Sequence, residues 1–339
     1  MSFIEEIKNR AKSNQKTIVL PEASDKRIIE AAAIALQEEY ANIILLGDED
    51  KINKIADENH FDIAKATIIN PKISEKRKEY AESLYDLRKA KGMTLEQAQE
   101  LILDEVYFGM MMVKKEEADG LVSGAIHSTS DTLRPALQIL KTAPNTKLVS
   151  AFFVMVVPNC QYGEEGTFVF GDCGLNQNPN AEELAEIAKS SSDSFEQLVG
   201  KPAKVGMLSY STYGSAKSEL TQKVIDATNL IKEKYPEMNV DGEFQLDSAI
   251  VPEVAASKAP TSKIAGTCNT LIFPDLNSGN IGYKLTQRFA KAEAYGPLCQ
   301  GIAKPVNDLS RGCSAQDVAG VIAITCVQAC QEALKGSAP

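Results

Sequence analysis

The chain has 339 residues, of which 44% are hydrophobic and 24% charged, the usage of an ordinary globular protein. This composition excludes a disordered chain and a collagen-like chain. Lys and Arg number 36 against 46 Asp and Glu, a net charge of −10, so nucleic acid and anionic membrane surfaces are not expected as partners. A length above about 300 residues favours two domains over one enlarged core.

The N-terminus and the cysteines indicate a cytoplasmic protein. Residues 1–6 lack both the basic and the apolar segment of a signal peptide. The longest apolar run, residues 151–158, is too short to cross a bilayer. Seven cysteines without paired spacing are expected to be reduced thiols.

The first half of the chain alternates short apolar runs with helical patterns. A capping box of Ser2 and Glu5 opens the first helix, and Thr94 with Gln97 opens a later one. A Ser/Thr-rich loop then leads into a helix that carries Arg134. Strands are expected at 17–20, 43–47, 67–69 and 120–124.

From about Leu148 the same alternation continues. Helices are expected after Asn180, after Ser190 and over 215–235, and a buried apolar helix over 314–334. Residues 273–284 predict the end of a strand, a polar Gly-rich turn and the start of a helix. Short apolar strands that alternate with helices indicate an α/β fold with mostly parallel sheets. Strands are expected at 149–157 and 167–170, as a pair, and at 205–208 and 271–273.

Several known site motifs are absent from the sequence. It contains no G-x-G, no P-loop lysine, no G-x-S-x-G, no H-E-x-x-H and no C-x-x-C. The only histidines are His60 and His127, so no dedicated metal site is expected. For His127 we expect a local turn contact with the adjacent Ser128 rather than acid–base catalysis.

The arginines carry more information. There are seven, and Arg27, Arg134 and Arg311 are each interpreted as following a strand end, although no strand bounds are predicted before Arg311, which ends the segment 305–311 just before the last helix. Ligands of α/β sheets bind beyond the carboxyl ends of strands, where helix N-termini and hydroxyls also attract anions. Each arginine alone could form an ordinary surface ion pair. Three at the same kind of position favour a polyanionic ligand that carries phosphate groups.

Residues 310–317 admit two interpretations. Ser314 and Asp317 have the spacing of a capping box for the last helix. Alternatively, Asp317 lies in the first helical turn near Arg311, where its carboxylate could accept a proton from a nucleophile. The two roles can coexist.

Long segments of the chain resemble the phosphate acetyl/butyryltransferase family. The length and the first-half motifs are closer to the acetyl than to the shorter butyryl members. The matching segments are 296–301, 304–312 with Asp317, 273–277 with 279–280 and 283–284, 20–22 with Arg27, and 128–129 with Thr132 and Arg134.

The resemblance implies a fold, a reaction and an assembly. The fold would comprise two α/β domains like those of isocitrate and isopropylmalate dehydrogenases, 1–147 plus 298–339 and an inserted 148–297, with the active-site cleft between them. The reaction would be acetyl-CoA + phosphate = CoA + acetyl phosphate, with CoA as a substrate, no cofactor and no metal. The assembly would be a homodimer.

The resemblance also assigns roles to residues. Asp317 would be the general base, Ser310 would bind the thiol or the reacting carbonyl, and Arg311 would hold the acetyl phosphate. The phosphate groups of the substrates would contact the remaining site residues, which are Arg134, Arg88, Arg27, Ser128, Thr132, Tyr283 and Lys284.

Direct attack by the CoA thiolate sets a physical requirement. A free thiol with a pKa of about 8.5 and a free aspartate of about 3.9 differ by roughly 6 kcal/mol against proton transfer. We therefore expect Asp317 to be partly buried and the thiol to lie beside positive charge. An acyl-cysteine on Cys160 or Cys313 is not required. The alternatives are a butyryl or broader short-chain transferase, a dehydrogenase of the shared fold, and a non-catalytic regulatory domain like that behind malic enzymes.

Overall fold

The computed structural model describes residues 2–144 and 146–335. Its contacts divide the chain into two compact units, Met1–Pro144 with Ile302–Pro339, and Asn145–Gly301. Both units combine a sheet with covering helices, and the expected α/β class with mostly parallel sheets is confirmed.

The first unit is built on a five-stranded sheet in the order β11-β4-β1-β2-β3, and every pair in it is parallel. All four strands expected in this half are present, and β3 has the bounds expected for it. The fifth strand, β11, was not expected. The strands are β1 (Lys16–Leu20), β2 (Ala41–Leu46), β3 (Thr67–Ile69), β4 (Gly120–Ser123) and β11 (Val306–Asp308).

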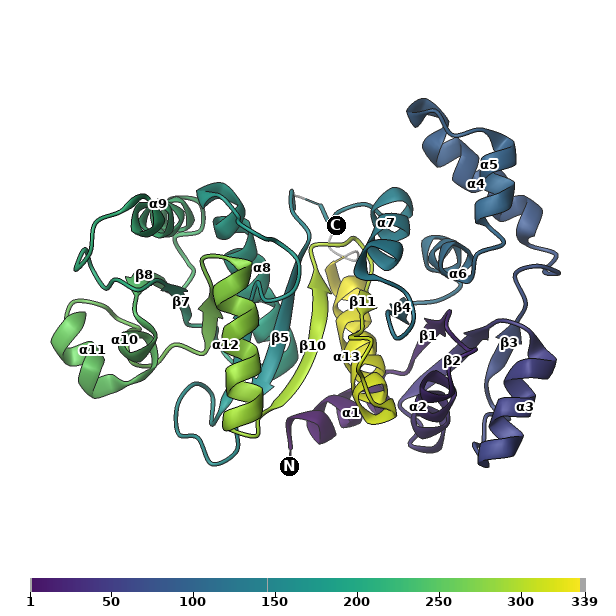
Figure 1. Ribbon diagram of the computed structural model, residues 1–339, viewed down its shortest axis with the longest axis horizontal. Helices are drawn as coiled ribbons and strands as arrows, with labels where there is room; N and C mark the ends of the chain where they lie inside the picture. Colours follow the sequence, from purple (N-terminus) through teal and green to yellow (C-terminus); the bar gives the residue numbers. More distant parts are fainter. Residues whose placement is uncertain (1, 145, 336–339) are drawn as a thin grey trace. The chain divides into compact units, whose positions relative to one another are not determined.

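Helices cover both faces of this sheet, with α6 and α7 on one side and α1, α2 and α13 on the other (Figure 1). The expected capping boxes of Ser2 with Glu5 and of Thr94 with Gln97 are confirmed. The helices are α1 (Phe3–Ser13), α2 (Lys26–Gln37), α3 (Glu49–Asn59), α4 (Arg77–Arg88), α5 (Leu95–Leu101), α6 (Glu105–Lys114), α7 (Thr129–Ile139) and α13 (Ala315–Lys335), with a 3₁₀ turn, η1, at Lys89–Lys91.

The second unit contains a six-stranded sheet in the order β10-β5-β6-β9-β7-β8. The pairs β10–β5 and β5–β6 are antiparallel and the other pairs are parallel. The expected pairing of the first two strands in this half is therefore confirmed. The strands are β5 (Ser150–Val156), β6 (Thr167–Gly171), β7 (Val205–Leu208), β8 (Val240–Phe244), β9 (Thr270–Ile272) and β10 (Glu293–Gln300).

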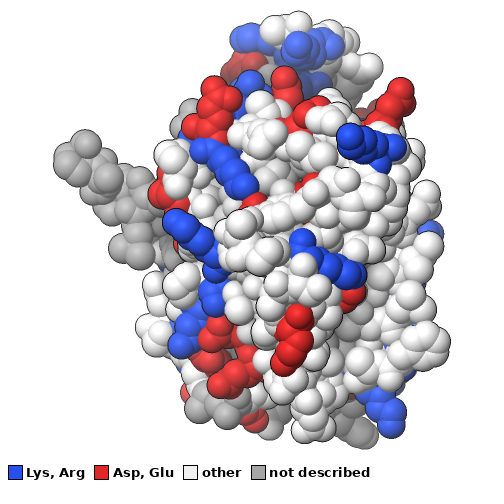
Figure 2. Space-filling view, turned by 90° about the vertical axis from the view of Figure 1, so that its left-hand side faces the viewer, with Lys and Arg blue, Asp and Glu red and all other residues white. Residues whose placement is uncertain are grey.

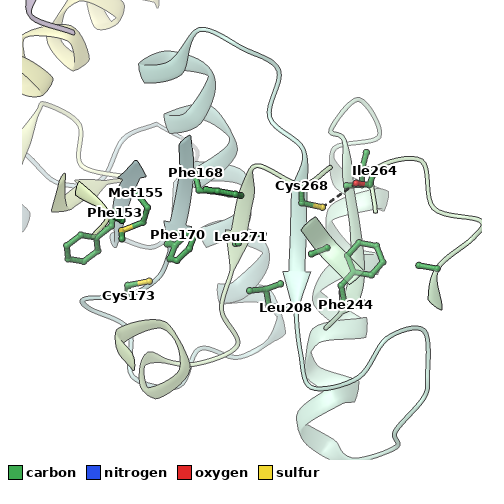
Figure 3. Close-up of a cluster of buried hydrophobic side chains, with 13 residues drawn as sticks. Phe153, Met155, Phe168, Phe170, Cys173, Leu208, Phe244, Ile264, Cys268 and Leu271 are labelled. Carbon is green, nitrogen blue, oxygen red and sulfur yellow. Dashed lines mark hydrogen bonds between the residues drawn. The ribbon is translucent and has the colours of Figure 1, made fainter. Parts of the chain in front are cut away.

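The described part of the second unit contains five helices and an apolar cluster formed mainly by residues of its strands. Two helical stretches expected after Asn180 and after Ser190 form one continuous helix, α8. Figure 3 shows part of the cluster, in which Phe153, Phe170 and Phe244 are buried. The helices are α8 (Ala181–Val199), α9 (Glu219–Lys234), α10 (Leu246–Ile250), α11 (Pro252–Lys258) and α12 (Leu276–Phe289).

The surface agrees with the composition. On the face shown in Figure 2, Lys and Arg are interspersed with Asp and Glu, and no continuous basic stretch is seen. Within 2–144 and 146–335, no helix has both the length and the hydrophobicity needed to span a bilayer.

Candidate functional site

The loops that follow three adjacent strands of the first unit gather at one edge of its sheet. Because β11, β4 and β1 are parallel neighbours, their carboxyl ends lie at the same edge. The loop after β1 is residues 21–25, the loop after β4 is 124–128, and the loop after β11 is 309–314. These loops and the helices that follow them carry Arg27, Arg134 and Arg311, as expected.

A buried glutamate holds the loop after β4. Glu22 is 2% exposed, and its carboxylate accepts hydrogen bonds from the consecutive backbone N–H groups of residues 124–127, at 2.8–2.9 Å. The Nδ1 atom of His127 lies 2.8 Å from the same carboxylate. Burial alone would raise the pKa of Glu22, but these hydrogen bonds outweigh it and lower that pKa. The expected local turn contact of His127 is therefore wrong, since its partner comes from the loop after β1.

Arg27 connects all three loops. Its Nη1 donates to the carbonyl oxygens of Arg311 and Cys313 at 2.8 and 2.9 Å. Its Nη2 donates to the carbonyl oxygen of Ala125 at 2.9 Å and to the Asp25 carboxylate at 2.7 Å, and its Nε donates to Asp25 at 3.0 Å. A guanidinium has five N–H groups. Every one of them has an acceptor within the chain.

A second buried acid joins the loops after β4 and β11. Asp308, the last residue of β11, is 1% exposed and accepts a 2.6 Å hydrogen bond from the Thr129 hydroxyl at the start of α7. Its other oxygen, Oδ1, is buried without a donor among the described residues. Burial raises the pKa of Asp308 to about 6. The start of α7 is therefore fixed to the end of β11.

Helix α7 places its site residues differently. Ser128 caps the helix, and its hydroxyl donates to Asp131 at 2.6 Å, which lowers the pKa of Asp131. Arg134 is exposed one turn later. Thr132 is fully buried, and its hydroxyl donates to Ser123 at 3.3 Å. A phosphate contact by Thr132 stays a prediction.

Three arginines of this unit contrast with Arg27. Among the described residues, no hydrogen bond or close ion pair involves the side chain of Arg88, Arg134 or Arg311. Arg88 lines a cavity of about 520 Å³ together with Lys91, and its Nε atom is buried without an acceptor. Burial raises the pKa of Tyr107, and the charges of Arg134 and Arg88 oppose that rise, so both guanidinium groups lie near this ring.

The predicted base lies at the start of α13. The Asp317 carboxylate accepts hydrogen bonds from the backbone N–H and the hydroxyl of Ser314, both at 2.8 Å, so the expected capping box is confirmed. Asp317, Ser310 and Arg311 are all exposed. The expected partial burial of Asp317 is wrong for this structure, because a first-turn carboxylate that caps its own helix faces outward.

The remaining two predicted residues belong to the second unit. The expected order of strand end, turn and helix start is confirmed, since β9 ends at Ile272 and α12 begins at Leu276. The turn is limited to 273–275, and the glycines expected in it lie in α12, where Asp275 accepts a hydrogen bond from the Ser278 N–H at 2.8 Å. A side chain in place of Gly279 would put a Cβ 2.4 Å from the Asp172 carbonyl oxygen, so this glycine serves close packing. On α12, Tyr283 stacks on Phe153 with ring centroids 4.0 Å apart. Lys284 is exposed.

Cysteine and metal chemistry find little support among the described residues. Cys313 is buried, and burial raises its thiol pKa, which disfavours a nucleophilic thiolate. No group of three or more His, Cys, Asp and Glu residues suited to a metal ion occurs in the part of the chain that the structure describes.

Sequence reasoning assigned no role to Glu22 or to Asp308. Both are acids placed at or just beyond the end of a short apolar strand. That position was the available signal, because an acid there is buried among loop N–H groups and hydroxyls rather than in solvent.

Comparisons with known proteins agree on one family. The chain matches the family described as phosphate acetyl/butaryl transferase over residues 2–326. A phosphate acetyltransferase of Acetivibrio thermocellus is 63% identical over 329 residues, which cover 97% of this chain and 98% of the relative. A phosphotransacetylase structure from Streptococcus pyogenes has a TM-score of 0.92 at 42% identity, covering 98% and 100%. EutD phosphotransacetylase from Staphylococcus aureus has a TM-score of 0.88 at 45% identity, covering 96% and 98%.

Proposed function

The chain belongs to the phosphate acetyl/butyryltransferase family, and from that premise we propose that it catalyses acetyl-CoA + phosphate = CoA + acetyl phosphate. The observation that carries this proposal is that the loops after three strands of the first unit are joined by hydrogen bonds from Arg27. Arg27 binds the loops that precede Arg134 and lead to Asp317, and among the described residues no carboxylate lies within ion-pair distance of Arg311 or Arg134. Unpaired guanidinium groups on a fixed backbone suit phosphate-bearing substrates.

In the direction of CoA acylation, the CoA sulfur forms a bond to the acetyl carbon of acetyl phosphate. The carbon–oxygen bond to phosphate breaks, and the phosphate leaves with the electron pair. Asp317 takes the thiol proton, and the Ser310 hydroxyl donates to the sulfur or to the carbonyl oxygen. Arg311 pairs with the acyl phosphate and stabilises the charge that grows as the phosphate departs.

The exposure of Asp317 constrains this mechanism. An exposed carboxylate is a weak base for a thiol, with a gap of roughly 6 kcal/mol between ordinary pKa values. Bound CoA must shield the carboxylate from water, and the adjacent Arg311 charge must stabilise the thiolate. No covalent acyl-enzyme and no cofactor enter this sequence of steps.

The other predicted residues bind phosphate groups in the proposal. Arg134 and Arg88 take the phosphates of CoA, supported by the cavity that Arg88 lines and by the nearness of both to Tyr107. Ser128, at the start of α7, adds a hydroxyl and a helix N-terminus. For Thr132, and for Tyr283 and Lys284 of the second unit, contact with a substrate phosphate is likewise part of the proposal.

The direct test compares acyl donors. CoA acylation is measured with acetyl, propionyl and butyryl phosphate side by side, and kcat/KM is expected to be highest for acetyl phosphate. One methylene group changes such a ratio by about 10- to 200-fold. A maximum at butyryl phosphate would replace the acetyl assignment with the butyryl alternative, and no acylation by any donor would remove the proposed function.

The base assignment has its own test. Asp317→Asn should lower kcat by about 10²- to 10⁴-fold with little change in KM for CoA, because the amide cannot accept the proton. Glu183→Gln is a matched control, since Glu183 is the acid of the capping box that opens α8. It should lower stability without lowering kcat. A near-normal kcat for Asp317→Asn would exclude the base role.

We also propose a homodimer, supported by an apolar stripe on α12. Ile281, Leu285 and Phe289 recur every fourth residue and are 58%, 49% and 84% exposed. Exposed large apolar side chains at this spacing are typical of a helix face that meets a partner. Sedimentation of Phe289→Glu is expected to show dissociation, and an unchanged sedimentation coefficient would remove α12 from the interface.

A cytoplasmic location completes the proposal. Among the described residues, six cysteines carry free thiols, which suits a reducing compartment; they are Cys160, Cys173, Cys268, Cys313, Cys326 and Cys330. Recovery of the protein in the cytosolic fraction of its source cells tests this location.

A further inference from the structure

Residues 20–22 with Arg27 match the family motif, and the mechanism above gives none of them a contact with a substrate. Resting on the proposed function, we propose that Arg27 is a positioning residue that holds the two substrate loops in register, and that it does not bind a substrate phosphate.

The hydrogen bonds of Arg27 leave it no donor for a ligand. All five of its N–H groups have acceptors within the first unit. Its charge is also paired, since Nη2 lies 2.7 Å from the Asp25 carboxylate. A phosphate could bind here only by displacing a backbone carbonyl or Asp25, and would meet the negative charge of that carboxylate.

The acceptors of Arg27 lie on the two loops that matter for the reaction. The carbonyl of Ala125 belongs to the loop that leads to Ser128 and Arg134. The carbonyl of Arg311 belongs to a proposed catalytic residue, and that of Cys313 immediately precedes the capping box of α13. One rigid, planar group therefore sets the backbone of both loops relative to each other.

Glu22, which precedes Arg27 by five residues, binds the backbone N–H groups of the loop after β4. Glu22 accepts the N–H groups of residues 124–127, while Arg27 donates to the carbonyl oxygen of Ala125. Donors and acceptors of this loop are thus bound by two side chains five residues apart in the sequence. A segment that binds both N–H groups and a carbonyl oxygen of a loop fixes the conformation of that loop's backbone.

The candidate site arginines of this unit thereby divide into two kinds. Among the described residues, no carboxylate lies within ion-pair distance of Arg88, Arg134 or Arg311, so these three can bind phosphate. Arg27 is saturated. The division predicts different kinetic effects, because loss of a ligand raises KM, whereas loss of a positioning group lowers kcat.

The test uses Arg27→Gln and Arg27→Lys with two thiol substrates, CoA and pantetheine, which lacks the phosphates of CoA. For both variants we expect kcat to fall about 100-fold, the scale of a small misplacement of catalytic groups. KM for acetyl phosphate and for CoA should change less than about threefold, and the CoA-to-pantetheine ratio of kcat/KM should be unchanged. Lysine should not rescue, because one ammonium cannot reach acceptors on three loops.

Arg77→Gln is the matched control. Among the residues that the structure describes, Arg77, at the start of α4, donates only to nearby backbone carbonyls of its own segment, and its loss should leave kcat unchanged. Two outcomes overturn the proposal. One is a rise in KM for acetyl phosphate or CoA of more than about tenfold in Arg27→Gln that lysine reverses. The other is a CoA-to-pantetheine ratio that collapses in the variant.

A measurement without catalysis separates this proposal from the proposed function. Amide hydrogen exchange of peptides that cover 124–127 and 311–314 should become at least about tenfold faster in Arg27→Gln, while peptides of the second unit stay unchanged. Unchanged exchange in both peptides would overturn the positioning role. Absence of transferase activity in the unaltered protein would overturn only the proposed function.

Discussion

One loop in each unit is held by a buried glutamate, and the two glutamates differ in the number of loop groups that they bind. In each, a buried glutamate at the carboxyl end of one strand binds the loop that follows the neighbouring parallel strand. Glu22 holds the loop after β4, and Glu243 holds the loop after β7, and both acids are 2% exposed.

The difference lies in what the two acids bind. Glu22 takes four consecutive backbone N–H groups and the His127 ring. Glu243 takes one backbone N–H, that of Gly214 at 2.9 Å, and the Ser211 hydroxyl at 2.7 Å. The loop after β7 also exposes Tyr210 and Tyr213 and borders an apolar cavity of about 380 Å³. The loop after β7 has further contacts, since the Tyr213 hydroxyl donates to Asp241 at 2.6 Å and the Gln245 N–H donates to the Thr212 hydroxyl at 2.9 Å. The two loops therefore differ in how many of their backbone groups the buried glutamate itself binds.

The largest expected effect comes from replacing each acid by its isosteric amide. Glu22→Gln places an NH₂ group against backbone donors and should lower the free energy of unfolding by about 3 kcal/mol and kcat/KM about 100-fold. Glu243→Gln loses fewer bonds and should cost about 1–2 kcal/mol with less than a threefold change in activity. Urea unfolding and steady-state kinetics check both. Equal kinetic losses would mean that the two loops do not differ in function.

A smaller effect is expected from a methyl group in each loop. Gly124 and Gly214 both have positive φ, +112° and +79°. A Cβ at Gly124 would lie 2.4 Å from the Asp308 Oδ1 atom and from the Leu309 N atom, whereas at Gly214 nothing lies within 4 Å. Gly214→Ala should therefore cost only the backbone strain, about 1 kcal/mol. Gly124→Ala should cost about 2 kcal/mol more, since backbone atoms must move. Thermal unfolding gives both values, and equal losses would contradict the close packing at Gly124.

Much of the fold could be predicted from local pattern. The apolar runs of β3 and β7 stand between clear helical segments, and their expected bounds match the structure. The strands β8, β10 and β11 were missed for a physical reason. Their sequences, VDGEF, EAYGPLCQ and VND, include Asp, Gly or Pro, and only pairing with a neighbouring strand makes them extended.

The candidate site could be predicted in its residue types but not in its contacts. That Arg27 and Arg134 follow strands could be predicted because each comes after an apolar run, whereas the strand before Arg311 is the polar sequence VND. That one of them is saturated could not, since its acceptors Ala125 and Cys313 lie 98 and 286 residues away. The burial of Asp308 has the same cause, because a short polar strand reveals its place in a sheet only through its neighbours.

The smallest expected effect is a pH dependence of the free energy of unfolding, which arises from the contact between His127 and Glu22. The loop after β7 should show no such dependence. The hydrogen bond with Glu22 raises the pKa of His127, and the nearby charges of Asp104 and Asp131 add to that rise. The stability from this contact is therefore fully present below the unfolded pKa of about 6.5 and is lost as pH rises through the higher folded pKa. At the acidic end, Glu22, whose pKa is lowered, retains its contribution until pH falls through that lowered value.

The measurement is the difference in unfolding free energy between the unaltered protein and His127→Gln from pH 5 to 9. Because the His127 side chain is 28% exposed, the difference should be below about 1 kcal/mol, largest near pH 5–6 and shrinking toward pH 9. In the loop after β7, burial raises the pKa of Tyr213 to about 12, so Tyr213→Phe should give a difference that is constant over this range. A constant difference for His127→Gln as well would mean that its contact with Glu22 is an ordinary neutral hydrogen bond, and the two loops would then differ only in the number of backbone groups that each acid holds.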